Sequence, residues 1–170
     1  MKEFINLLDE HSDFDFVIID TNPQFGPLTM AALRAATHTL LPTELEQYGI
    51  NGTIGMIEAI SQEQLRRPKN EPIKIAGILP NQVRKTAVHN KFLNDLRSIE
   101  KSEEWLLPPV AQRTIYTELV VDNAKPNCVF NLPPSNPARI ESEKWCSYVY
   151  ERVFEDKYNK IDIKENVAYG

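Results

Sequence analysis

Short apolar runs that alternate with stretches of helical spacing restrict the fold of this chain more than any other feature. The clearest runs are residues 14–19, interrupted only by Asp15, and residues 73–79. Nearly all-apolar strands separated by helices of roughly 10 to 15 residues indicate parallel strands, because right-handed crossovers place covering helices on each side. The sequence therefore predicts an α/β fold with a mostly parallel sheet and helices on both faces.

Helices are expected where apolar residues recur at three- or four-residue spacing, and strands in the short apolar runs. The expected helices span residues 4–8, 28–35, 50–60, 88–99, 114–121 and 137–154, and the expected strands span residues 14–19, 39–41, 73–79, 106–107 and 128–130. Pro42 should end the second strand. In the last helix we expect Asn136 as the N-cap and a buried face of Trp145, Val149 and Val153.

The composition bounds the kind of protein. With 170 residues and 42% hydrophobic side chains, the chain can bury one sizeable core, which we assign to residues 1–155, whereas the polar residues 156–170 are expected to form a flexible tail. A formal net charge of -5 means that any contact with DNA must be regional. The chain shows no signal peptide and no run of ~20 apolar residues, and Cys128 and Cys146 lack the spacing of a metal or disulfide site, so a cytoplasmic setting is expected.

One expected strand, residues 16–19, ends abruptly in the carboxylate of Asp20. Ligands of open parallel sheets bind outside the carboxyl ends of the strands, so Asp20 would lie at the functional edge. A carboxylate at such a position is suited to holding Mg²⁺ through its water shell beside a nucleotide. The alternative is that Asp20 only caps the turn before the next helix, and the pattern alone does not separate the two roles.

The order of the following segments resembles the ParA/MinD group of deviant-Walker P-loop ATPases. Asp20 is followed by a proline-containing loop that ends at Gly26, by a helix rich in Thr, Leu and Ala, and by a strand ending in Leu41-Pro42. Residues 75–81, ending in Asn81, and residues 109–113 and 125–130 also occupy places that match the family. The resemblance covers residues 1–155, which would form a ParA-like ATPase domain.

The resemblance implies a function, with ATP and Mg as cofactors. Asp20 would be the catalytic residue and would hold the metal through water, and residues 21–26 would form a switch loop. The implied nucleotide-binding residues are Asp20, Asn22, Pro23, Asn81, Pro109 and Val110. The implied DNA-binding residues are Arg84, Lys85 and Arg113. The family further implies a homodimer on nonspecific DNA that works with a ParB-like adaptor or cargo protein, associated with the nucleoid and not with a membrane, to position a plasmid, a chromosome or other cargo.

The chain departs from the family at the phosphate-binding loop. Family members carry a Lys-Gly-Gly-x-Gly-Lys-Thr loop, and none of the six glycines here is so arranged. Backbone amides and lysines of that loop hold the phosphates, so we expect no ATP turnover by this chain alone. A fragment, a disrupted gene or a diverged remnant with an unpaired sheet edge would explain the departure. The alternative function is a non-enzymatic interaction module, and the reading frame upstream of Met1 would separate the two.

Overall fold

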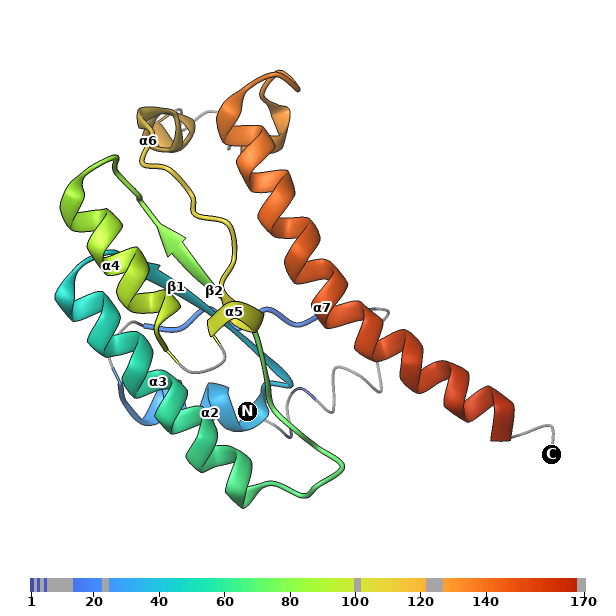
Figure 1. Ribbon diagram of the computed structural model, residues 1–170. Helices are drawn as coiled ribbons and strands as arrows, with labels where there is room; N and C mark the ends of the chain where they lie inside the picture. The colour runs from blue at the N-terminus through green and yellow to red at the C-terminus, as the bar shows by residue number, and fades with distance from the viewer. Residues whose placement is uncertain are drawn as a thin grey trace. The chain divides into compact units, whose positions relative to one another are not determined.

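The computed structural model describes residues 1, 3, 5, 14–22, 25–99, 102–121 and 127–167. Their elements are α2 (Pro27–Ala35), β1 (His38–Glu44), α3 (Gln47–Arg66), β2 (Lys74–Asn81), α4 (Ala87–Arg97), α5 (Ser102–Trp105), α6 (Thr114–Val121), the 3-10 helix η1 (Val129–Asn131) and α7 (Pro137–Val167), which Figure 1 shows in chain order. The chain forms two compact units. The first unit comprises residues 1–39 and 55–74, and the second comprises residues 40–54 and 75–170.

The second unit contains the paired strands. β1 and β2 form a two-stranded sheet, and residues 106–111 extend it through parallel bridges from Ile78 to Leu106 and from Val83 to Ala111. In Figure 1, α4 and α7 lie on opposite sides of β2. Parallel strands with helices on both sides confirm the predicted α/β class.

The core of the second unit joins the strands to α7. Leu79, Leu107 and Val110 are buried together, and Trp145 and Val149 of α7 pack against them. Burying side chains of this size stabilises a fold by about 1.5 to 3 kcal/mol each. Trp145 and Val149 of the predicted face of the last helix therefore pack against the core, although each is only half-buried.

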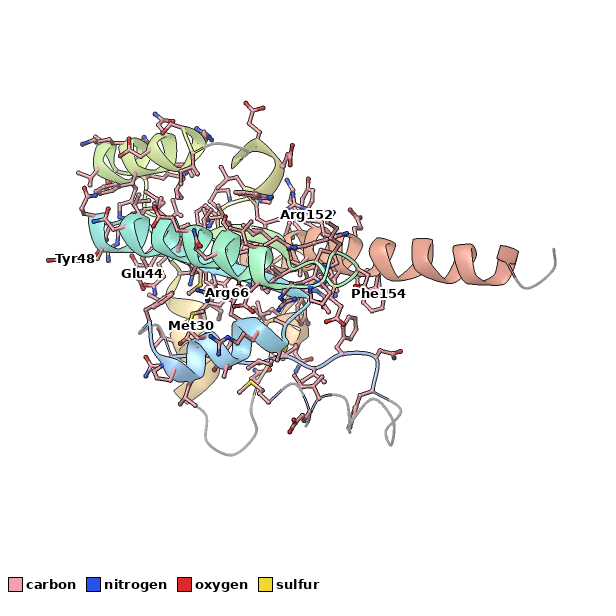
Figure 2. All side chains as sticks on the ribbon, turned by 90° about the horizontal axis from the view of Figure 1, so that it is seen from below. Met30, Glu44, Tyr48, Arg66, Arg152 and Phe154 are labelled. Atoms are coloured by element: carbon pink, nitrogen blue, oxygen red, sulfur yellow. The ribbon has the colours of Figure 1, made fainter. Side chains whose placement is uncertain are left out.

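Two polar contacts fix α7 at separate points. At its start, the Asn136 side-chain oxygen accepts a hydrogen bond from the Ala138 N–H at 2.9 Å, which confirms the predicted N-cap. Further along, the Arg152 guanidinium donates to the backbone oxygens of Ala76 at 2.7 Å and Trp105 at 3.3 Å. Figure 2 shows Arg152 among the side chains drawn as sticks. Because Arg152 satisfies carbonyls of two neighbouring segments, it ties α7 to the strand layer.

The first unit holds α2 and the second half of α3. α2 confirms the helix expected at residues 28–35, with Ala32 and Leu33 buried and Leu28 exposed. The Arg67 guanidinium donates to the carbonyl oxygens of Leu33 at 2.6 Å and Ala36 at 2.9 Å. These bonds satisfy carbonyls that the end of α2 leaves without helical partners.

The predicted strand at residues 14–19 is wrong. Residues 16–22 form no ladder, and Ile18 is 92% exposed. A strand is stabilised only when a neighbour takes up its backbone hydrogen bonds, and no strand of the described part of the chain pairs with this segment. The apolar pattern is therefore present without the structure that it predicts.

Three other elements differ from prediction. β1 continues through Pro42 to Glu44, because an exposed proline is tolerated on an edge strand. Residues 129–131 form η1 in place of the strand expected at 128–130. α7 continues to Val167, because no Gly or Pro between residues 155 and 167 ends it, so the tail expected at 156–170 begins inside a helix. The helix expected at 4–8 lies largely outside the described residues.

The helices of the described ranges fall short of a bilayer span. Among them, none is both long enough and apolar enough to cross a membrane. A crossing helix needs about 20 predominantly apolar residues, and charged residues interrupt even the long helix α7.

Candidate functional site

The carboxyl end of β2 and the segment after Leu107 form one edge in the second unit. The Val110 N–H donates to the Pro80 oxygen at 2.9 Å, and the Val83 N–H donates to the Val110 oxygen at 2.9 Å. Asn81 therefore lies between two residues that are bonded to Val110. Two of the predicted nucleotide-binding residues, Asn81 and Val110, are brought together here, with Pro109 exposed beside them.

Gln82 joins the ends of β1 and β2. Its φ of 53° places it in the left-handed region, which is uncommon for a residue other than glycine. Its side-chain amide donates to Glu44 Oε1 at 3.0 Å. Neither Gln82 nor Glu44 was predicted as a site residue, although polar residues at the carboxyl ends of two neighbouring strands are a signal that could have identified them.

Arg84 and Lys85 lie exposed between β2 and α4. The Arg84 backbone N–H donates to His89 Nδ1 at 3.2 Å, and its Nε donates to the Gln112 side-chain oxygen at 2.5 Å. Arg84 is thus held in place while its charge remains at the surface, and its role in DNA binding stays a prediction.

Arg113, the third predicted DNA-binding residue, is bound to Glu141 of α7. Its Nε donates to Glu141 Oε2 at 3.2 Å and its terminal nitrogen donates to Oε1 at 2.5 Å. The hydrogen bond to Glu141 raises the pKa of the Arg113 guanidinium. Glu141 Oε2 also accepts from the Ala111 N–H at 3.3 Å. Because its charge is compensated, Arg113 is better suited to fixing the strand end than to binding phosphate.

Asp20 and Asn22 belong to the first unit. Asp20 is exposed on the segment that forms no ladder, so it does not end a strand as predicted. The Asn22 carbonyl accepts a hydrogen bond from the Thr29 hydroxyl at 3.4 Å, which ties this segment to α2. Pro23 lies outside the described residues. The roles of these residues with a nucleotide remain predictions.

The described residues are suited to contacting the base of a nucleotide but not its phosphates. The amide of Asn81 can both donate to and accept from a base edge, and Pro109 offers exposed apolar surface beside it. The glycines in the described ranges lie elsewhere: Gly26 precedes α2, three lie within α3, and Gly77 lies within β2. They form no loop of consecutive amides that could hold phosphates.

The described residues offer few ligands for a metal ion. Within the ranges that the structure describes, no three His, Cys, Asp or Glu side chains gather in a way that could hold one. Mg²⁺ at a nucleotide usually keeps several waters and takes one or two carboxylates with the phosphates. Asp20 could fill that role only if another group supplied the phosphate contacts.

Comparisons with known proteins match part of the chain to one family and most of it to longer relatives. Residues 2–75 match the family model AAA_31, described as an AAA domain. The chain is 26% identical over 155 residues to the uncharacterized protein MJECL24 of Methanocaldococcus jannaschii, covering 90% of this chain and 57% of that protein. It is 33% identical over 66 residues to the chromosome-partitioning ATPase Soj of Thermus thermophilus, covering 39% and 26%.

A solved structure has a similar fold. The ATP complex of a substituted variant of Cyanothece McdA superposes with a TM-score of 0.70 at 20% identity, covering 89% of this chain and 55% of that one. The likeness supports the α/β, P-loop NTPase-like fold. The chain spans little more than half the length of MJECL24 and McdA and about a quarter of Soj.

Proposed function

We propose that this chain, which belongs to the ParA/MinD-like P-loop ATPase family, contributes the base-binding edge and the switch segment of a partition or positioning ATPase. The observation that carries the proposal is the pair of backbone hydrogen bonds from Val110 to Pro80 and Val83, which bring Val110 beside the carboxyl end of β2, where Asn81 lies. This is the edge at which open α/β sheets bind their ligands. The intact system would form an ATP-dependent homodimer on DNA and move cargo through an adaptor protein.

This chain lacks the groups that would bind the phosphates of a nucleotide. When bound, Mg-ATP would supply the scissile phosphate and its charge-neutralising cation, and Asp20 is the residue of this chain that would hold the ion through water. Because the chain has no glycine-rich loop, those phosphates would lack their amide and lysine contacts. We therefore expect the chain by itself not to hydrolyse ATP.

DNA contact is proposed at the start of α4. Arg84 and Lys85 are exposed there, and Arg84 is oriented by Gln112. Arg113 is left out of this surface, because Glu141 compensates its charge. Changing Arg84 and Lys85 together to Ala should reduce the slope of log affinity for duplex DNA against log salt by up to about two, since each neutralised phosphate contributes roughly 0.9. The variant Arg113→Ala should leave that slope nearly unchanged.

The test of the proposed function is a titration of Mg-ATP into the chain with turnover measured in the same samples. We expect turnover at the level of a protein-free blank for wild type and for Asp20→Ala. Hydrogen exchange should slow at residues 81–83 and 110–111, where the base would bind, and Asn81→Ala should remove that effect. Turnover that Asp20→Ala abolishes would contradict the expected inactivity, and unchanged exchange at the β2 edge would remove the nucleotide claim.

The exposed apolar segment that precedes Asp20 favours a second candidate function. Phe16, Val17 and Ile18 are all at least 46% exposed. Exposed apolar groups of this kind are typical of protein interaction surfaces. A non-enzymatic interaction module derived from the same fold would keep such a surface without needing a nucleotide, and its exchange rates would not respond to Mg-ATP.

A further inference from the structure

The ladder along β2 is irregular at its carboxyl end. The Val110 N–H donates to the Pro80 oxygen at 2.9 Å, and the Val110 oxygen accepts from the Val83 N–H at 2.9 Å. A regular parallel ladder leaves one residue between two such bonds, whereas Asn81 and Gln82 both lie between them here. This arrangement is a β-bulge, and bulges often lie beside functional sites because they redirect a side chain.

Gln82 is the strained residue of this bulge. Its φ of 53° lies in the left-handed region, and within the described ranges it is the only residue other than glycine with a positive φ. Glycine would adopt this backbone without steric cost, so a purely structural turn would not require a glutamine here. Backbone outliers of this kind cluster at ligand sites. The side chain of Gln82 is therefore a candidate for contact with a ligand.

Glu44 determines which end of the Gln82 amide is left for a ligand. An ionised carboxylate can only accept, so Gln82 turns its NH2 group toward it, and Nε2 donates to Glu44 Oε1 at 3.0 Å. Oε1 of Gln82 lies on the other side of the amide, and no hydrogen bond among the described residues uses it. Both side chains are exposed, so a ligand can reach this oxygen. The pair thus presents a fixed acceptor next to Asn81.

We infer that Gln82 is a specificity-determining residue that selects a base with an exocyclic amino group, and that Glu44 is the positioning residue that orients its amide. The amino group at C6 of adenine donates to an acceptor, whereas the carbonyl at C6 of hypoxanthine would meet the Gln82 oxygen as a second acceptor. A site that pairs with one of these groups disfavours the other, because the mismatched contact leaves both unpaired. The inference rests on the proposed binding of a base at Asn81 and adds what selects that base.

The affinities of the whole chain for Mg-ATP and for Mg-ITP, its inosine counterpart, test the inference, because the two nucleotides differ only in the base. Dissociation constants are measured by nuclear magnetic resonance titration of the backbone amides of residues 81–83. We expect the wild type to bind Mg-ATP about five- to tenfold more tightly, the contribution of roughly one hydrogen bond. Gln82→Gly, which keeps the left-handed backbone, should make the two constants equal.

Charge reversal at Glu44 separates base selection from a merely structural role. In Glu44→Lys the ammonium can only donate, so Gln82 should turn its oxygen toward it and present its NH2 group to the base. The preference should then change to Mg-ITP. Glu46→Lys makes the same change of charge at a nearby exposed residue and should preserve the wild-type preference for Mg-ATP.

Failure of the inference and failure of the proposed function give different results. The inference is overturned, and the proposed base-binding edge stands, if both nucleotides shift residues 81–83 with equal affinity in the wild type. The same conclusion follows if Gln82→Gly or Glu44→Lys keeps the wild-type preference. If neither nucleotide shifts these residues, both the inference and the proposed base-binding edge are contradicted.

Discussion

Residues 14–20 and residues 106–112 are two short segments with opposite outcomes. The first has the stronger strand pattern, four apolar residues ending in Asp20, yet residues 16–20 form no ladder. The second is interrupted by Pro108 and Pro109, yet it makes parallel bridges to Ile78 and Val83. The difference lies in the neighbour, because β2 pairs with one segment and no strand of the described chain pairs with the other. Strand propensity describes a side-chain pattern, whereas strand formation requires a partner.

The largest difference between the two segments is expected when one apolar side chain is truncated in each and the free energy of unfolding is measured. Leu107 is 2% exposed, so Leu107→Ala should lower the free energy of unfolding by about 2 to 5 kcal/mol. Ile18 is 92% exposed, so Ile18→Ala should change it by less than about 0.5 kcal/mol. Urea unfolding followed by far-ultraviolet circular dichroism measures both, and equal losses would show that residues 14–20 are packed after all.

Two glycine substitutions test how closely residues 106–112 pack against β2. A Cβ at Gly77 would overlap the Leu107 side chain, lying 2.6 Å from its Cγ, so Gly77→Ala should cost about 1 to 3 kcal/mol. Gly52 lies within α3 and has open space around it, so Gly52→Ala should stabilise the protein by about 0.5 to 1 kcal/mol. The same urea series checks both signs. A stabilising Gly77→Ala would mean that Leu107 does not lie against β2.

The hydrogen bonds of Glu141 should contribute less to the free energy of unfolding than the buried core side chains do. Glu141→Gln weakens the bonds to Arg113 and Ala111 and should cost about 1 to 2 kcal/mol, because charged hydrogen bonds at partly buried positions contribute in this range. Asp20→Asn, on the exposed segment, should change stability by less than about 0.5 kcal/mol. Thermal unfolding of the two variants measures the difference. A larger loss from Asp20→Asn would place that carboxylate in a structural contact.

The smallest expected effect is a pH dependence from Cys146 of α7. Burial, and to a lesser degree the nearby Cys128, raises the pKa of the Cys146 thiol above its ordinary value. A raised folded-state pKa means that the stabilising contribution is present at neutral pH and is lost as the pH rises through the folded value. Cys146→Ala should therefore flatten the decline of stability above about pH 9. Cys128→Ala, at an exposed thiol, should preserve most of that decline.

Much of the fold could be predicted from the sequence because its signals are local. The helix at 114–121 and the start of α7 at Pro137 agree with their predicted bounds, and Asn136 caps α7 as expected. Helical spacing and capping need only nearby residues, so the sequence carries them directly. The order of segments along the chain also indicates the family.

The remaining parts depend on contacts between residues far apart in the sequence. Glu141 meets Arg113 across 28 residues, and Gln82 meets Glu44 across 38, and no local pattern specifies either pair. The predicted strand at 16–19 fails for the same reason, since pairing is a property of two segments. The segments of Asn81 and Val110 lie side by side because the carboxyl ends of neighbouring parallel strands meet at one edge, and the nucleotide-binding role of the two residues stays a prediction.

Amide hydrogen exchange of the chain without ligand tests the central comparison most directly. The N–H groups of Leu107, Val110 and Gln112 donate to Ile78, Pro80 and Val83, and should exchange about 100-fold or more slowly than unprotected amides. The amides of Val17, Ile18 and Ile19 should exchange near the unprotected rate. Protection of residues 17–19 equal to that of Leu107 would contradict the account, because it would show that this segment already has a strand partner within the chain.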